Sequence, residues 1–171
     1  MIADILLKIA AEEYQELSGN KNYSPRPSSA GPERCLRQMV YEAMGFPRKP
    51  LSGRAVITFD DSTWHEELTV DLMRRSDFHC HSEQMAVDIP NAFHWESGEY
   101  YCHVCDKHVK RRDMHGHIDW IATDPMGVDH LIEHKALSHF GFQHLVDGEM
   151  PLDYLTQMAL YMRGLQRDQP N

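Results

Sequence analysis

The chain has 171 residues, of which 42% are hydrophobic and 25% charged, which predicts a soluble globular protein with a single domain over residues 1–171. No apolar run approaches the roughly 20 residues that a membrane span requires, and the N-terminus lacks the basic start and cleavage site of a signal peptide, so we expect a cytoplasmic protein. A formal net charge of −9 argues against a protein that coats nucleic acid non-specifically.

Positive charge is nevertheless concentrated in one segment. Residues 21–55 contain seven basic and two acidic side chains, a net charge of +5, which leaves −14 for the remainder of the chain. A basic surface on an otherwise acidic protein would bind a polyanion at that surface. The acidic residues elsewhere could then bind a metal ion. The alternative is a solvated basic surface without a partner.

The N-terminal part of the chain predicts two helices separated by a loop. Residues 3–17 carry apolar side chains at helical spacing, and the Pro-, Ser- and Gly-containing stretch from Lys21 to Pro32 reads as a loop. A short helix over residues 33–44 is expected to end at Gly45. Arg34 and Arg37, three residues apart, would share a face and bind phosphate.

A third helix is expected to begin at residues 60–63. Thr63 and Glu66 fit a capping box, and the helix would continue to about Arg75. His65 would lie in its first turn, a position where a histidine is more often a surface residue than a ligand. The expected buried side consists of Trp64, Leu68, Leu72 and Met73.

Strands dominate the middle of the chain. Residues 79–89 alternate as a strand, residues 91–113 read as an insertion, and residues 115–123 return to a strand. The turn at residues 124–127 then leads into a strand over residues 131–137. The chain continues into a final helix from Pro151 to Gly164, in which Gln157 and Tyr161 project together because they are four residues apart.

Glu133 and Lys135 interrupt the apolar run of residues 131–137. In a strand they would share one face, where a carboxylate and an ammonium cost desolvation free energy unless each has a partner. Asp119 would lie on the antiparallel neighbouring strand, close enough to share a cation with Glu133. Two carboxylates from adjacent strands suit Mg²⁺ or Mn²⁺, which prefer oxygen ligands.

Asp119 followed by Glu133-His134-Lys135 resembles the acid, acid and lysine pattern of the PD-(D/E)xK nucleases. Such a resemblance implies an α/β fold with a restriction-endonuclease-like core, in which helices flank a mixed central sheet. The surrounding residues resemble the RecB-like branch, which includes the CRISPR-associated exonuclease and phage-encoded relatives. Four pieces match in order: His65, residues 116–119, residues 133–135, and Gln157 with Tyr161.

The resemblance implies a role for each matching residue. His65, Asp119, Glu133 and the carbonyl of His134 would hold the metal, and Lys135 would be the catalytic lysine. Gln157 and Tyr161 would position the nucleic acid. The N-terminal Ser28-Ser29-Ala30-Gly31, together with Cys35, Arg37 and Tyr41, also looks like that family's opening segment.

Two features depart from the family pattern. Iron-sulfur members pair a cysteine placed like Cys35 with three more near the C-terminus, whereas this sequence has none after Cys105, so Cys35 is expected to be a small buried residue. The family also adds strands after the helix ending near Gly164, which suggests a minimal form or a truncated chain.

Cys102-x-x-Cys105 predicts half of a structural zinc site in the insertion at residues 91–113. Cys80 is the first choice for a further ligand and His81 the second. An iron-sulfur cluster built from all four cysteines, or free thiols, are the alternatives. The neighbouring cations Lys110, Arg111 and Arg112 would contact DNA or form a solvated charge run. Candidate ligands after His81 are His79, His94, His103 and His108.

These patterns and the resemblance together predict a Mg²⁺- or Mn²⁺-dependent deoxyribonuclease. The resemblance alone implies an enzyme of exonuclease or flap type that acts on single-stranded or end-containing DNA. We expect a monomer in the cytoplasm, which would be the host cytoplasm for a phage-encoded protein. The alternatives are a non-catalytic nucleic-acid-binding module that uses the zinc knuckle and basic segment, and a dimeric structure-selective resolvase.

Overall fold

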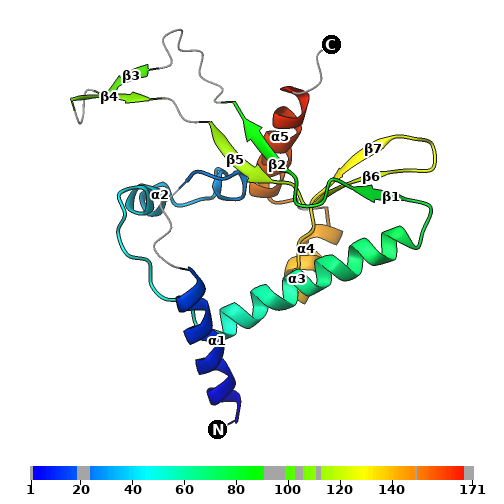
Figure 1. Cartoon of the computed structure of the whole chain (residues 1–171), viewed down its shortest axis with the longest axis horizontal. Helices are drawn as coiled ribbons and strands as arrows, with labels where there is room; N and C mark the ends of the chain where they lie inside the picture. The colour runs from blue at the N-terminus through cyan, green and yellow to red at the C-terminus, as the bar shows by residue number, and fades with distance from the viewer. Residues whose placement is uncertain are drawn as a thin grey trace. The chain divides into compact units, whose positions relative to one another are not determined.

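The computed structural model describes residues 2–18, 24–90, 99–102, 106–110, 113–148 and 150–167, which form a mixed α/β structure (Figure 1). The chain divides into two compact units, each assembled from segments distant in sequence. Unit 1 comprises Met1–Tyr23, Cys35–Glu83 and Asp119–Glu149, and unit 2 comprises Ser24–Arg34, Gln84–Ile118 and Met150–Asn171.

Unit 1 contains the helices α1 (Ile2–Ser18), α2 (Leu36–Ala43), α3 (Gly53–Arg74) and α4 (His139–Val146). The first two confirm the helices expected from the sequence, and Gly45 follows α2 with a φ of 78° that favours glycine. Helix α1 lies across the first turns of α3 (Figure 1), where a Cβ atom on Gly53 would be 1.7 Å from the Leu7 carbonyl oxygen. Glycine therefore permits this close contact between the two helices.

Helix α3 begins earlier than the sequence indicated, so the predicted start at residues 60–63 is wrong. Ser52 is its N-cap and accepts a hydrogen bond from the Ala55 amide at 3.3 Å. Thr63 lies within the helix, where its hydroxyl donates to the Phe59 carbonyl, and it caps nothing. His65 consequently lies in the middle of the helix.

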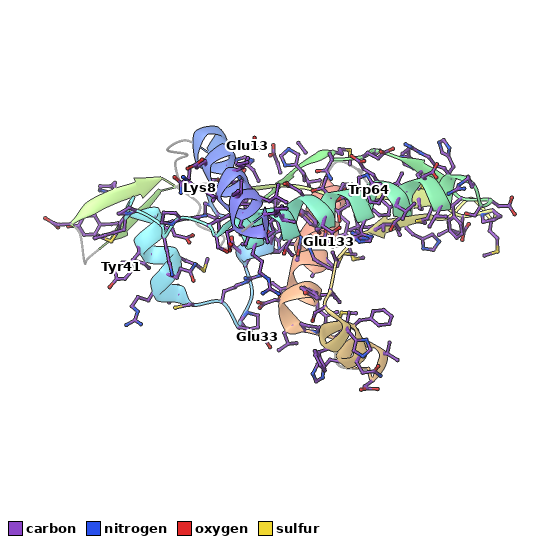
Figure 2. All side chains as sticks on the ribbon, turned by 90° about the horizontal axis from the view of Figure 1, so that it is seen from below. Lys8, Glu13, Glu33, Tyr41, Trp64 and Glu133 are labelled. Carbon is purple, nitrogen blue, oxygen red and sulfur yellow. The ribbon has the colours of Figure 1, made fainter. Side chains whose placement is uncertain are left out.

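The buried side of α3 also differs from the expectation. Val56 and Val70 are buried, and Met73 packs against the core as predicted. Trp64 is instead 67% exposed, and Figure 2 marks its position on α3. Leu68 and Leu72 are exposed as well, so the face of α3 that packs on the sheet is the one that carries Val70 and Met73.

One antiparallel sheet completes unit 1. It has the order β1 (His79–His81), β6 (Trp120–Thr123) and β7 (Asp129–Ile132). Strand β6 alternates in burial, and its inward residues Trp120 and Ala122 form the core with Cys80 and with Val70 of α3. The opposite face of the sheet therefore carries the intervening side chains of these strands.

Unit 2 packs a two-stranded sheet and a short 3₁₀ turn against one helix. Strand β2 (Ala86–Ile89) pairs antiparallel with β5 (Met114–His117), and both η1 (Pro27–Ser29) and β2 contact α5 (Leu152–Arg167). The described part of the insertion is an antiparallel hairpin of β3 (Glu99–Cys102) and β4 (Lys107–Lys110). Unit 2 thus builds its core around α5.

The strand expected over residues 79–89 is two strands. Cys80 is buried in β1, whereas Val87 and Ile89 are buried in β2, so the alternation of burial shifts by one residue between them. The shift falls where Ser82 and Gln84 adopt positive φ values of 55° and 50°. The side-chain pattern of residues 79–89 therefore predicted one continuous strand, although the backbone breaks between β1 and β2.

The described strands pair only antiparallel, so the expected mixed central sheet is not found among them. No helix in the described ranges combines the length and the apolar character that a membrane crossing requires.

Candidate functional site

The β6–β7 hairpin of unit 1 organises the candidate site, and it confirms the hairpin expected from the sequence. Trp120 pairs with Ile132 and Thr123 with Asp129. At the turn, the Gly127 amide donates to the Asp124 carbonyl at 2.9 Å, and Gly127 has a φ of 83°. This turn fixes the register that brings residues 119 and 133 opposite each other, one position beyond the paired strands.

Asp119 is anchored to the segment that follows β7. Its Oδ2 atom accepts a hydrogen bond from the His134 amide at 2.6 Å, and the Lys135 ammonium donates to Glu133 Oε1. The Glu133 side chain is only 8% exposed and that of Lys135 30% exposed. The Asp119 carboxylate and the Glu133–Lys135 pair therefore lie at the same end of the hairpin.

The expectation of a strand over residues 131–137 is wrong in one respect. Strand β7 ends at Ile132, and residues 133–138 have no regular structure. The hydrogen bond from the His134 amide to the Asp119 side chain lies just beyond Trp120 and Ile132, the last backbone pair of the ladder. The acidic pair is thus positioned by a side-chain contact at the end of the ladder, and not by the middle of a strand.

Oxygen ligands suit a hard divalent cation, and Asp119, Glu133 and the His134 carbonyl supply them. His65 is not brought to this group. Its Nε2 atom lies 3.7 Å from Asp61 Oδ2 on the same helix, and its side chain is half exposed. Among the described residues, no three His, Cys, Asp or Glu side chains are arranged to hold a metal ion. The acids fit such a cation, and His65 as placed does not join them.

Gln157 and Tyr161 lie in unit 2, on α5, and both are buried, at 5% and 4% exposure. Tyr161 packs against β5, where a Cβ atom on Gly116 would lie 2.8 Å from Tyr161 Cε1 and 2.9 Å from Pro27 Cδ. The two side chains share one face of α5 as predicted, but that face packs into the interior of unit 2.

The two arginines expected to share a helix face do not do so, because α2 begins at Leu36 and Arg34 precedes it. In unit 2, Arg34 Nε lies 3.1 Å from Asp153 Oδ2, and an Arg34 terminal nitrogen donates to the Ser28 carbonyl at 3.0 Å. Arg37 is exposed on α2 in unit 1. Only Arg37 therefore lies on a helix, and the two arginines belong to different units.

The cysteine site is only partly described. Cys80 is buried in the apolar core of unit 1, where desolvation raises the pKa of its thiol. His81 points to the other face of β1, and its ring lies 3.2 Å from Thr123 Oγ1 and 2.9 Å from Ser82 Oγ. Only the backbone of Cys102 is described, and Cys105, Arg111 and Arg112 lie outside the described residues, as does the Lys110 side chain. The zinc site stays a prediction.

Asp153, an acid in the first turn of α5, was not among the expected site residues. Its Oδ1 atom accepts a hydrogen bond from the Glu33 amide at 3.2 Å, in addition to its ion pair with Arg34. Cys35 is exposed, contrary to the expectation of a buried residue. One sequence signal for Asp153 was available, because Asp153, Gln157 and Tyr161 recur every four residues.

The chain matches no protein-family model, no curated protein and no solved structure.

Proposed function

We propose that the protein is a metal-dependent deoxyribonuclease of the PD-(D/E)xK type, with a restriction-endonuclease-like core, that hydrolyses single-stranded or end-containing DNA in the cytoplasm. The observation that carries the proposal is the hairpin end, where Asp119 is hydrogen-bonded to the His134 amide and Lys135 is paired with Glu133. Two carboxylates and one ammonium at the same end of the hairpin match the charge distribution that phosphodiester hydrolysis requires.

Each residue has a distinct role in this proposal. Asp119 and Glu133 would hold Mg²⁺ or Mn²⁺, which when bound acidifies a water molecule and offsets negative charge at the phosphate. Lys135 orients the attacking water and stabilises charge that develops on the phosphate oxygens. The hydrogen bond from the His134 amide fixes the Asp119 carboxylate, so the acid does not have to be ordered when substrate binds.

The proposal is tested with end-labelled single-stranded DNA in Mg²⁺, in Mn²⁺ and in EDTA. The wild-type protein should cleave only with a metal ion, and Lys135→Ala should lower the rate constant for cleavage by about 10²-fold or more. Lys8→Ala is the matched control, because Lys8 forms an exposed pair with Glu12 on α1. Cleavage by Lys135→Ala at the wild-type rate would contradict the assigned role.

A protein that binds DNA but cleaves none under any metal condition would favour the non-catalytic binding module instead. Metal analysis of the same sample would test the predicted zinc at Cys102 and Cys105, because one equivalent of zinc retained after dialysis supports it.

A further inference from the structure

One face of α5 carries a fixed segment of chain. Asp153, Gln157 and Tyr161 follow each other at intervals of four residues and so lie in a row along the helix. All three are covered: the Asp153 side chain is 14% exposed, and the other two are buried. Because η1 packs on α5, this row lies under the chain around Pro27.

Asp153 holds the far end of that segment with both carboxylate oxygens. One oxygen accepts from the Glu33 amide and the other pairs with Arg34, whose guanidinium also donates to the Ser28 carbonyl. Gly31 lies between these contacts, where a Cβ atom would be 1.9 Å from Asp153 Oδ1. The carboxylate is therefore closely enclosed by the chain that it binds.

The near end of the segment is fixed by a closed turn. The Arg26 amide donates to Ser29 Oγ at 3.3 Å, and Ser29 Oγ donates back to the Arg26 carbonyl at 2.9 Å. Pro27 is fully buried, whereas the side chains of Arg26 and Ser28 are exposed. Residues 26–34 thus form a rigid segment that presents a guanidinium and a hydroxyl outward.

We propose that residues 26–34 form a phosphate-binding segment for the nucleic-acid backbone, in which Arg26 and Ser28 make the contact and Asp153 is a positioning residue. An arginine and a hydroxyl are common donors to phosphate oxygens. The part of the basic stretch that belongs to unit 2, residues 24–34, contains Arg26 and Arg34 against one acid, Glu33, a net charge of +1. Arg34 is committed to Asp153 and Ser28, so its part is to fix the segment. Gln157 and Tyr161 support the segment from beneath.

This inference takes its ligand, DNA, from the proposed function. Measuring DNA binding in the absence of catalysis tests the inference separately. Fluorescence anisotropy of a labelled single-stranded oligonucleotide in EDTA, at several salt concentrations, gives the dissociation constant and its salt dependence. Arg26→Gln should weaken binding and reduce the slope of log Kd against log salt by about one. Arg75→Gln is the control, because it removes an equal charge from an exposed pair on α3 and should leave the slope unchanged.

The positioning role is tested by a double-mutant cycle. Asp153→Asn should weaken binding in the wild-type background, and it should have no further effect in the Arg26→Gln background, because its effect passes through Arg26. Additive effects of the two substitutions would overturn the assignment, as would unchanged binding by Arg26→Gln. Circular dichroism checks that each variant folds. If Asp153→Asn does not fold, Arg34→Gln takes its place, because it removes the ion pair but leaves the hydrogen bond from the Glu33 amide to Asp153. Arg34→Gln should show the same coupling to Arg26→Gln.

The outcomes separate the two proposals. DNA binding that depends on Arg26, without metal-dependent cleavage, would support the phosphate-binding segment and contradict the nuclease. Metal-dependent cleavage with unchanged binding by Arg26→Gln would support the nuclease and contradict the segment.

Discussion

The Asp124 carboxylate shows how single side chains hold the hairpin. Its Oδ2 atom lies 3.0 Å from His130 Nε2, and its Oδ1 atom accepts from the Met126 and Val128 amides at 2.8 and 2.9 Å. The contact with His130, followed by these amides, lowers the pKa of Asp124. Its ionised form therefore stabilises the folded state above the ordinary aspartate pKa of about 3.9, and the stabilisation is lost as pH falls through the lowered folded-state pKa.

We accordingly expect Asp124→Asn to be less stable than the wild-type protein at pH 5.5, with a difference that shrinks toward pH 3. Urea unfolding at a series of pH values measures the free energy of unfolding of both proteins. A difference that stays constant over the whole range would contradict this account of the turn.

The Cys80 and Cys35 thiols should differ in reactivity. Burial, followed by opposing charge effects of Arg74 and Glu83, raises the pKa of Cys80, so less of it is thiolate at pH 8, whereas Cys35 is exposed. Labelling with iodoacetamide, mapped by peptide mass spectrometry, should modify Cys35 at least about tenfold faster than Cys80. Denaturant should abolish the difference. Equal rates in the folded protein would show that Cys80 is not in the core.

At the scale of elements, two glycines in helices should respond oppositely to alanine. Gly53→Ala places a Cβ atom 1.7 Å from the Leu7 carbonyl oxygen, which must move, so we expect a loss of about 1–3 kcal/mol in the free energy of unfolding. In Gly141→Ala the nearest neighbouring atom is 3.5 Å away, and higher helix propensity should stabilise α4 by up to about 1 kcal/mol. Denaturant unfolding measures both, and a neutral Gly53→Ala would contradict the α1–α3 contact.

Local patterns predicted some elements better than others. The first two helices and the β6–β7 turn followed from apolar spacing and from Gly45 and Gly127, whose conformations depend on neighbouring residues alone. The start of α3 was not predicted correctly. Residues 60–63 resemble an N-cap in the sequence, whereas the N-cap in the structure is Ser52. The break between β1 and β2 also escaped prediction, because the positive φ values there fall on Ser82 and Gln84 and no glycine marks the change in the sequence.

For the whole molecule, the predicted site residues fall into two compact units. Asp119, Glu133, Lys135 and His65 belong to unit 1, whereas Gln157 and Tyr161 belong to unit 2. The hairpin register was predictable because a short turn fixes it. The division into units and the burial of Gln157 were not predictable from the sequence. Both depend on contacts between residues far apart in the sequence, such as the hydrogen bond between Glu33 and Asp153.

The central claim is that Asp119 serves catalysis, and a matched pair of substitutions tests it most directly. Asp119→Asn and Asp129→Asn remove one carboxylate each from opposite ends of the same hairpin, and Asp129 is exposed beside Thr123. The measurement is the rate of cleavage of end-labelled single-stranded DNA in Mg²⁺, with folding checked by circular dichroism. We expect a loss of about 10²-fold or more for Asp119→Asn and a near wild-type rate for Asp129→Asn. Cleavage by a folded Asp119→Asn protein at the wild-type rate would contradict the account.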